Sequence, residues 1–227
     1  MSKKELDPWI GINRGLKETN GYQEGIEDYI DKKERRESLL LHSCCGPCST
    51  SVIERLVSRY DVTVFFYNPN IYDEEEYEKR LDAQVSFIRR FNQSRKAKET
   101  EKGVLTFHKV ELLVGDYKAQ EFYSVAKGLE SEPEGGQRCV ECFGLRLEKT
   151  AQTADLGGFN IFASTLTVSP YKNYDLITEI GRYLGAKYNI EYLAEDFKKN
   201  DGYLRSIELS KEYNLYRQGY CGCIYSK

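Results

Sequence analysis

The stretch Ser38-Leu-Leu-Leu-His42-Ser-Cys-Cys-Gly-Pro-Cys48 decides the fold of this chain. Its short apolar run at 38–42 predicts a buried strand. Gly46 and Pro47 end that strand, and Pro47 can open a helix because the first helical turn does not need its backbone N–H. Apolar residues at helical spacing continue to about residue 60. We therefore expect a strand, a tight turn that carries three cysteines, and a helix.

The same alternation of apolar runs and helical patterns continues to the C-terminus. It predicts further strands at 62–67, 106–112, 159–166 and 190–193, and helices at 74–91, 117–130, 145–155, 174–187 and 206–215. Between these elements, we expect 92–103 to be a charged loop. Residues 1–20 look irregular, and a helix is expected near 22–35.

Strands that alternate with helices at this spacing are typical of a mainly parallel sheet with helices on both faces. The sequence thus predicts an α/β protein with a single doubly wound, Rossmann-like or HUP-like sheet and a helical C-terminal segment. We expect residues 1–36 to be a partly helical lead-in. Residues 37–227 should form one α/β domain with a cysteine-bearing tail.

Composition excludes two classes of protein. Lys and Arg number 33 against 36 Asp and Glu, so the net charge of −3 does not suit a globally basic nucleic-acid binder. No apolar run approaches the roughly 20 residues of a membrane span. The opening residues, MSKKELDPWIG, lack a hydrophobic signal-peptide core. We expect a cytoplasmic protein, in which thiols stay reduced or bind metal.

All seven cysteines fall into three tight clusters. Thiolates grouped in this way hold a soft metal ion or an iron–sulfur cluster, or carry out thiol–disulfide exchange. The sequence therefore indicates metal or redox chemistry. The clusters are Cys44-Cys45-x-x-Cys48, Cys139-x-x-Cys142 and Cys221-x-Cys223.

The spacing of the first two clusters fits two kinds of metal centre. Cys139 and Cys142 share one face of the helix that they open, so both can reach the same centre. Together with the adjacent pair Cys44 and Cys45 they supply the four thiolates of a [4Fe–4S] cluster. Cys48 could instead complete a second two-cysteine knuckle, which is the arrangement of structural zinc. Spacing alone leaves both centres open.

The third cluster, Cys221-Gly-Cys223, also has two readings. A disulfide across one intervening residue is strained and easily reduced, which suits a reversible redox pair. The same two thiols and Cys48 remain after a four-cysteine cluster is assigned, so they could ligate a second metal. His42, just before the first cluster, could donate protons, ligate metal or satisfy a buried hydrogen bond.

Five motifs of the chain stand in the order of one known family. Together they resemble the cobalamin-independent epoxyqueuosine reductases of the QueH type, from about residue 37 to the C-terminus. The motifs are the stretch at 40–48, Phe66-Tyr-Asn-Pro-Asn-Ile71 with Glu76, Tyr77 and Arg80, Cys139-x-x-Cys142-Phe-x-x-Arg146-Leu147, Ser164-Thr-Leu-Thr-Val-Ser-Pro-Tyr-Lys172, and Leu215-Tyr-Arg-Gln-Gly-Tyr-Cys-Gly-Cys223.

The resemblance implies an oxidoreductase that removes the epoxide oxygen of epoxyqueuosine at the wobble position of the tRNA anticodon, the last step to queuosine. It implies tRNA as partner and an electron donor that the sequence does not identify. It favours iron–sulfur over zinc and assigns Cys221 and Cys223 to a redox-active pair. The cluster ligands that it implies are Cys44, Cys45, Cys139 and Cys142.

Deoxygenation needs two electrons, whereas a [4Fe–4S] cluster passes one at a time. The second store could be the Cys221/Cys223 dithiol, or an additional mononuclear iron held by these thiols and Cys48 could bind the epoxide oxygen. His42 is the nearest acid for the leaving oxygen, and Tyr220 is a second. Polar and cationic residues of the motifs are expected to bind the substrate: Asn68, Asn70, Arg80, Arg146, Lys172, Arg217 and Gln218.

Three other functions are weighed against this one. A zinc-stabilised RNA-binding module without catalysis would contain zinc and no iron. A thiol–disulfide oxidoreductase would act through Cys221 and Cys223 alone. A nucleotide-dependent tRNA-thiolating enzyme would need a phosphate loop after the first strand, where Pro47 removes an N–H that a phosphate could use.

Overall fold

The computed structural model describes residues 12–14, 36–102 and 108–226, and its strands form one sheet. All strand pairs are parallel, in the order β1-β4-β3-β2-β5-β6. The α/β prediction is confirmed, with a sheet that is entirely parallel. The strands are β1 (Ile12–Arg14), β2 (Glu37–Ser43), β3 (Tyr60–Phe66), β4 (Glu111–Val114), β5 (Ile161–Ser164) and β6 (Glu191–Tyr192).

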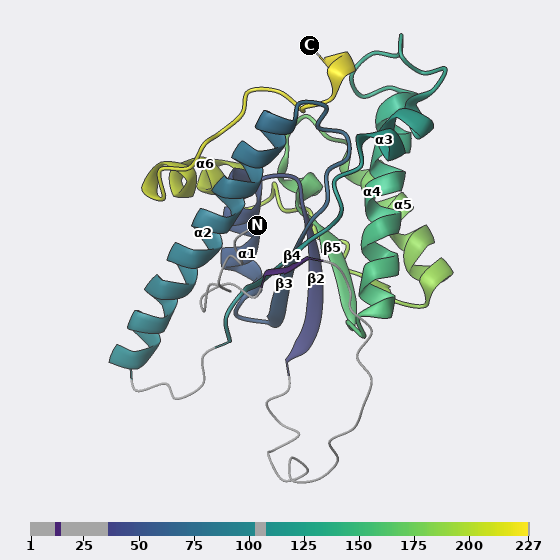
Figure 1. Ribbon diagram of the computed structural model, residues 1–227. Coiled ribbons are helices and arrows are strands. Elements are labelled where there is room, and N and C mark those ends of the chain that lie inside the picture. The colour runs from purple at the N-terminus through teal and green to yellow at the C-terminus, as the bar shows by residue number, and fades with distance from the viewer. Residues whose placement is uncertain (1–11, 15–35, 103–107, 227) are drawn as a thin grey trace.

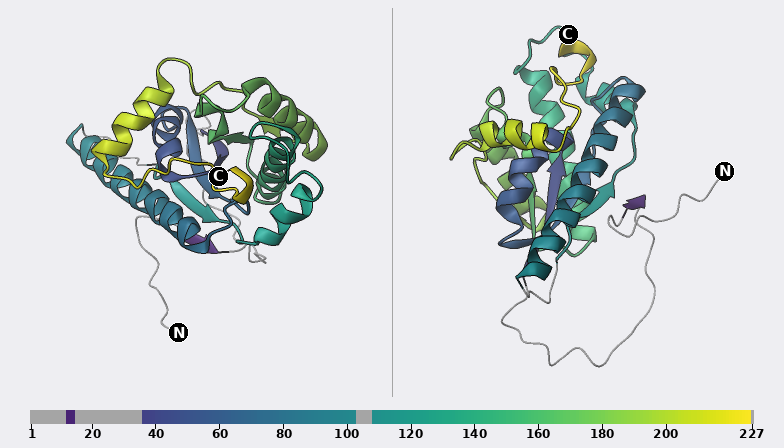
Figure 2. Two further views of the ribbon diagram at one scale, coloured as in Figure 1. Left: turned by 90° about the horizontal axis from the view of Figure 1, so that it is seen from above. Right: turned by 90° about the vertical axis from the view of Figure 1, so that its left-hand side faces the viewer.

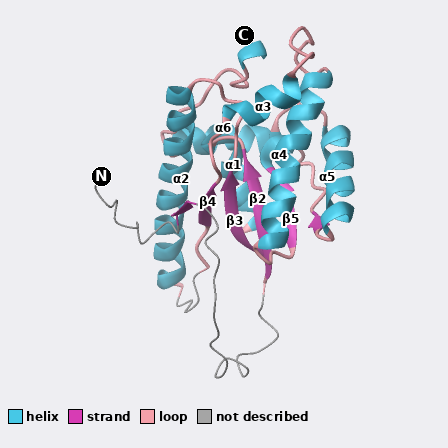
Figure 3. Cartoon of the chain, turned by 45° about the vertical axis from the view of Figure 1, so that its right-hand side comes forward, coloured by secondary structure: helices cyan, strands magenta, loops and turns pink. Residues whose placement is uncertain are grey.

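Helices cover both faces of the sheet (Figures 1 and 3). On one face, α1 (Gly46–Leu56) contacts α2 (Glu74–Glu101) and α6 (Gly202–Glu212). On the other, α4 (Gln137–Leu156) contacts α3 (Ala119–Ala126) and α5 (Tyr174–Tyr188). Short 3-10 helices follow β5 at Thr165–Val168 (η2) and end the described chain at Ile224–Ser226 (η3).

The central strand β2 explains why its apolar run is continuous. Leu39 and Leu41 pack into the core beneath α1 and α2, and Leu40 packs into the core beneath α4 and α5. All three side chains are fully buried. Successive side chains of a strand point to opposite faces, so a strand covered on both sides is apolar at every position.

The order of the strands places the functional site. From β2 the chain moves outward through β3 to β4, then returns to β5 on the other side of β2. The connections that follow β2 and β5 therefore lead to opposite sides of the sheet. In open parallel sheets, ligands bind where two neighbouring strands lead apart in this way. The cysteine-bearing turn follows β2, and η2 follows β5.

One expected loop is helical. Residues 92–103 were predicted to be a charged loop, but α2 continues to Glu101. Its N-terminus is capped by Asp73, which accepts hydrogen bonds from the backbone N–H groups of Glu75 and Glu76. Charged residues such as Arg and Lys are good helix formers, and Arg95 pairs with Glu99 one turn later at 2.9 Å. A solvent-facing helix needs no apolar stripe, which is why the pattern missed it.

Other boundaries also differ from the prediction. Residues 12–14, expected to be irregular, form β1 beside β4, since pairing with an existing strand edge requires little local periodicity. The third strand was expected at 106–112, and β4 lies at 111–114. Its first two predicted positions and the helix near 22–35 lie outside the described residues. Among the helices that the structure describes, none has the length and hydropathy to cross a membrane.

Gly46 allows α1 to approach α2 closely, and this contact can be tested. A Cβ at Gly46 would lie 2.8 Å from the carbonyl carbon of Ala83 and 3.0 Å from the backbone nitrogen of Gln84. We expect Gly46→Ala to lower the free energy of unfolding in urea by about 1–3 kcal/mol, because backbone must shift. Gly144→Ala in α4, where a Cβ would meet nothing within 4 Å, is the control and should be neutral or slightly stabilising. Equal losses in both variants would refute a steric requirement.

Candidate metal and redox centre

The three cysteine clusters meet above one end of the sheet. The first follows β2, the second opens α4, and the third lies in the C-terminal tail. The views from the side and from above agree that the tail crosses the end of the sheet at which β2 leads into α1 (Figures 1 and 2). Clusters that are far apart in sequence therefore share one region of the molecule.

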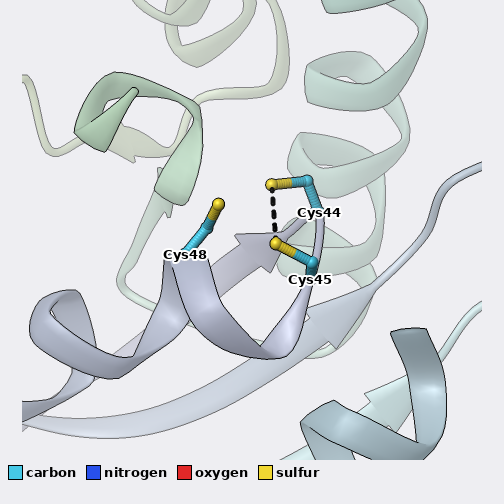
Figure 4. A group of neighbouring side chains, drawn as sticks. All are labelled: Cys44, Cys45 and Cys48. Carbon is cyan, nitrogen blue, oxygen red and sulfur yellow. Dashed lines mark hydrogen bonds between the residues drawn. The ribbon is translucent and has the colours of Figure 1, made fainter. Parts of the chain in front are cut away.

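Cys44, Cys45 and Cys48 form a compact group of thiols. Their sulfur atoms all lie within 4.8 Å of one another, and those of Cys44 and Cys45 are 3.8 Å apart. Figure 4 shows the three sulfurs turned toward a common space. The cysteine spacing had grouped Cys48 with Cys44 and Cys45, and the structure places it there, because one helical turn separates Cys45 and Cys48. That Cys48 also joins Cys221 and Cys223 at a second metal site stays a prediction.

Buried polar side chains hold the turn that carries these thiols. Ser43 donates to Gln84 Oε1 on α2 at 2.6 Å, and the Gln84 amide donates to Ser49 at 2.9 Å. The Cys44 N–H donates to Thr165 Oγ1 of η2 at 3.4 Å. Sequence reasoning missed Gln84 because nothing local marks a residue that acts across the interface between α1 and α2. Thr165 stood within a quoted motif but was not selected.

The second and third clusters share one apolar environment. Cys142 and Cys223 are buried together with Phe122 and Ala126, and Cys221 packs against this group. All seven thiols are free in the structure. The Gly135 N–H donates to Cys139 Sγ at 3.2 Å. The tail is thus docked on the part of α4 that carries the second cluster.

Arg146 connects all three clusters electrostatically. Its side chain is 1% exposed, and its Nη2 is one of the buried nitrogens without a hydrogen-bond partner in the described part of the chain. Burial disfavours its charge, yet its pKa is raised because thiols of Cys142, Cys221 and Cys44 lie nearby. A buried cation needs anionic partners. This arrangement suits a centre that carries negative charge.

Lys172 adds a second cation to the same centre. Burial lowers its pKa, but thiols of Cys44, Cys221 and Cys48 outweigh this and raise it. The Lys172 carbonyl accepts a hydrogen bond from Lys198 at 3.4 Å, which holds the loop after η2. Arg146 and Lys172 thus lie near the thiols, whereas their predicted role in substrate binding stays a prediction.

The three thiols of the first cluster differ in pKa. Hydrogen bonds from Cys45 and Cys48 hold the pKa of Cys44 well below its usual value. Burial, followed by the bond to Cys44, raises the pKa of Cys45 to about 12. The bonds to both neighbours raise the pKa of Cys48. The group therefore concentrates negative charge on Cys44, the thiol that Arg146 and Lys172 both face.

His42 has a structural environment. It is fully buried, its Nε2 donates to the Tyr67 carbonyl at 3.1 Å, and its Nδ1 accepts from Ser164 Oγ at 2.9 Å. Burial and then the charge of Arg146 lower its pKa to about 3. Both ring nitrogens are occupied, so the geometry argues against the predicted roles of proton donor and metal ligand.

Two predicted substrate-binding arginines are engaged elsewhere. Arg80 pairs with Glu76 at 2.6 Å and donates to the Cys221 carbonyl at 2.8 Å. Arg217 donates to Ser210 of α6 at 3.3 Å and lies over the ring of Tyr203. The guanidinium of Arg80 thus binds the tail, and that of Arg217 binds α6. Arg80 is buried and Arg217 is half-buried, and their role in substrate binding stays a prediction.

Three predicted amide side chains retain unused acceptors. Asn68 donates to the Ser43 carbonyl at 2.9 Å, but its Oδ1 has no partner in the described structure. The Oδ1 of Asn70 and the Oε1 of Gln218 are likewise buried and unbonded. A hydrogen bond from Gln218 also favours the thiolate of Cys45, which places this residue at the first thiol group. Buried acceptors without partners are costly, so each of these oxygens is expected to accept a hydrogen bond from water or from a ligand.

Comparison with known proteins points to one family. Residues 39–227 match the family model described as "Epoxyqueuosine reductase QueH". A protein of that name from Streptococcus pyogenes serotype M1 is 44% identical over 196 residues, which cover 86% of this chain and 72% of the relative. One from Staphylococcus epidermidis is 41% identical over 90% of this chain and 84% of its own length.

A more distant relative agrees. The protein of the same name from Thermotoga maritima is 33% identical over 192 residues, which cover 83% of this chain and 90% of the relative. The resemblance expected from the five motifs is therefore confirmed, and the chain belongs to the epoxyqueuosine reductase QueH family.

Proposed function

We propose that this protein reduces epoxyqueuosine at the wobble position of tRNA to queuosine. The observation that carries the proposal is the convergence of three cysteine clusters around buried Arg146, in a chain that belongs to the reductase family. The reaction takes place in the cytoplasm on tRNA, with residues 37–227 as the catalytic domain.

The reaction consumes two electrons and two protons. Both C–O bonds of the epoxide break, the carbon–carbon double bond of the cyclopentene forms, and the oxygen leaves as water. The protein must therefore deliver electrons twice and protonate the oxygen. An electron donor that is not part of this chain supplies the electrons.

The residues present suit a [4Fe–4S] cluster on Cys44, Cys45, Cys139 and Cys142. Two thiols come from the turn after β2 and two from the first two turns of α4, whose N-terminal N–H groups favour anionic sulfur at Cys139. The unpartnered Nη2 of Arg146 beside these thiols supplies a donor that a cluster of net negative charge would accept. When bound, such a cluster supplies one-electron transfer.

The remaining thiols are proposed as the second device. Cys221 and Cys223 can act as a dithiol that gives up two electrons and two protons on forming a disulfide. Alternatively, they hold an additional mononuclear iron with Cys48. Lys172, whose pKa is raised by both Cys48 and Cys221, would compensate negative charge in either case.

Substrate binding is assigned to the acceptors and cations that the fold leaves unused. Asn68, Asn70 and Gln218 would accept hydrogen bonds from the amino and hydroxyl groups of the modified base. Lys172 would meet RNA phosphate. Beside it, Tyr171 is 86% exposed and can stack on a neighbouring base of the anticodon loop. Recognition of an unstacked loop base needs no broad basic surface, which agrees with the net charge of −3.

Metal content is the first test of this proposal. Protein purified without oxygen should contain about four irons and four sulfides per chain. It should also show a brown visible band that bleaches with dithionite, because the cluster accepts an electron. A fifth iron would support the mononuclear site over the dithiol. Colourless protein with stoichiometric zinc, from cells able to build clusters, would refute the reductase chemistry and favour an RNA-binding module.

Turnover separates the thiols by role. With anaerobic wild-type enzyme and tRNA bearing epoxyqueuosine, mass analysis of the nucleosides should show loss of one oxygen atom. Cys139→Ser should lose both iron and activity. Cys221→Ser and Cys223→Ser should retain most of the [4Fe–4S] spectrum but lose turnover by at least about a hundredfold, and Cys48→Ser should share this loss if the three thiols hold an iron. Full activity in all three variants would exclude both second devices.

Because the bonds of His42 are structural, their loss should affect stability. Ser164→Ala leaves the buried Nδ1 of His42 without its donor, so we expect a loss of about 1–3 kcal/mol in the free energy of unfolding. Thr178→Val is the matched control, since the buried Thr178 hydroxyl has no partner in the described structure, and it should cost little. Unchanged stability in Ser164→Ala would return His42 to the list of catalytic candidates.

A further inference from the structure

Two buried arginines donate hydrogen bonds to the backbone of the C-terminal tail on either side of Cys221 and Cys223. Arg80 reaches the tail from α2, and Arg138 from the first turn of α4. They are 2% and 1% exposed, respectively. Both are among the largest fully buried side chains of the described structure, although surface exposure is the usual state of arginine.

Arg80 binds the tail just before and at Cys221. Its Nη2 donates to the Tyr220 carbonyl at 3.3 Å and its Nη1 to the Cys221 carbonyl at 2.8 Å. Its guanidinium lies over the Tyr220 ring, 5.3 Å from the centroid. Glu76, itself buried, accepts from Arg80 Nε and neutralises the charge. Glu76 Oε2 also accepts from Tyr216 at 2.7 Å, so the same pair holds the start of the tail.

Gly222 packs directly against the guanidinium of Arg80. Its φ of +96° lies in the region that favours glycine, and a Cβ there would lie 3.0 Å from both Nη atoms of Arg80. Its carbonyl accepts from the Tyr72 N–H at 3.2 Å. The backbone between the two cysteines therefore rests directly on the guanidinium, which explains why glycine separates them.

Arg138 binds the tail beyond Cys223. Its Nη2 donates to the Tyr225 carbonyl at 3.3 Å, and its guanidinium lies over the Tyr225 ring at 5.1 Å. Its Nη1 donates to the carbonyls of Leu129 and Glu130 at 3.0 and 2.9 Å. Arg138 directly precedes Cys139, so one residue ties the tail to the start of the helix that carries the second thiol cluster.

We infer that Arg80 and Arg138 are positioning residues that hold Cys221 and Cys223 against Cys142, and that Arg80 does not bind RNA. This inference rests on the proposed function, in which the tail thiols complete the centre. Arg80 binds the carbonyls of Tyr220 and Cys221, Arg138 binds that of Tyr225 two residues beyond Cys223, and Cys223 is buried with Cys142. The two arginines thus fix the backbone of the tail, and Arg138 also donates a hydrogen bond to the Cys223 thiol.

The test measures each cysteine separately in the reduced, metal-free full-length chain. The variant is Glu76→Gln/Arg80→Met, which removes the ion pair as a unit and leaves no buried charge unpaired. Alkylation with iodoacetamide, resolved by peptide mass analysis, should become faster at Cys221 and Cys223 by on the order of tenfold, since hydrogen bonds from a charged group are lost. The rates at Cys44, Cys45 and Cys48 should stay unchanged.

Arg90→Met is the matched control. Arg90 also lies on α2, also donates to a backbone carbonyl, that of Tyr213, and also lies over a tyrosine ring. In the described part of the chain its hydrogen bond and its ring contact are both with Tyr213 and not with residues 220–226, so all seven rates should match the wild type. Unchanged rates at Cys221 and Cys223 in the double variant, or an equal increase at all seven cysteines, would overturn the inference.

Two further variants keep the test decisive if the double variant does not fold. Gly222→Ala leaves the ion pair intact and should release the same segment from Arg80. Arg138→Met should raise the alkylation rate of Cys223 more than that of Cys221. Unchanged alkylation in both folded variants would again contradict the positioning role.

Kinetics distinguish positioning from RNA binding. In the enzyme with its metal centre bound, loss of the hydrogen bonds from Arg80 to the tail should lower kcat and leave KM for tRNA unchanged. If Arg80 bound an RNA phosphate instead, its loss would raise KM. If the wild type has no reductase activity, the proposed function fails. The alkylation experiment still tests whether Arg80 and Arg138 hold Cys221 and Cys223 in place. The two failures are therefore distinguishable.

Discussion

The buried charge of Arg146 is the constraint around which the centre is organised. A guanidinium removed from water is unfavourable unless anionic groups compensate it. Its nearest electrostatic partners are thiols from all three cysteine clusters, Cys142, Cys221 and Cys44 among them. The convergence of the clusters and the burial of the arginine therefore depend on one another. A bound anionic iron–sulfur cluster would strengthen this mutual dependence, because it concentrates negative charge at the same place.

The rest of the architecture serves to bring those partners together. A parallel sheet directs every strand toward the same edge, so the turn after β2 and the segment after β5 meet there without further help. The C-terminal tail has no strand to direct it. Hydrogen bonds from Arg80 and Arg138 to its backbone carbonyls hold the tail in place instead. Arginine suits this task because its planar fork carries several donors in fixed directions.

Particular residues show where sequence reasoning succeeds. The run at Leu39–Leu41 predicted a strand buried on both faces, and each of these side chains is fully buried. The cysteine spacing grouped Cys48 with Cys44 and Cys45, and their sulfur atoms lie within 4.8 Å of one another, because side chains one helical turn apart face the same way. Sequence reasoning did not reveal Gln84, whose partners lie across the interface between α1 and α2, or the contacts of Arg80 with the tail. It also failed at the end of α2, where charged residues form a helix without an apolar stripe.

The sequence by itself determined the parallel α/β sheet, the family, and the identity of the thiols, since these depend on local periodicity and on ordered motifs. The tertiary structure alone decided how the thiols are grouped. It buried Cys223 with Cys142, occupied both nitrogens of His42, and turned Arg80 toward the tail. The physical reason is that a side chain's role depends on which donors, acceptors and charges remain unpaired after packing, and packing joins residues that are distant in sequence.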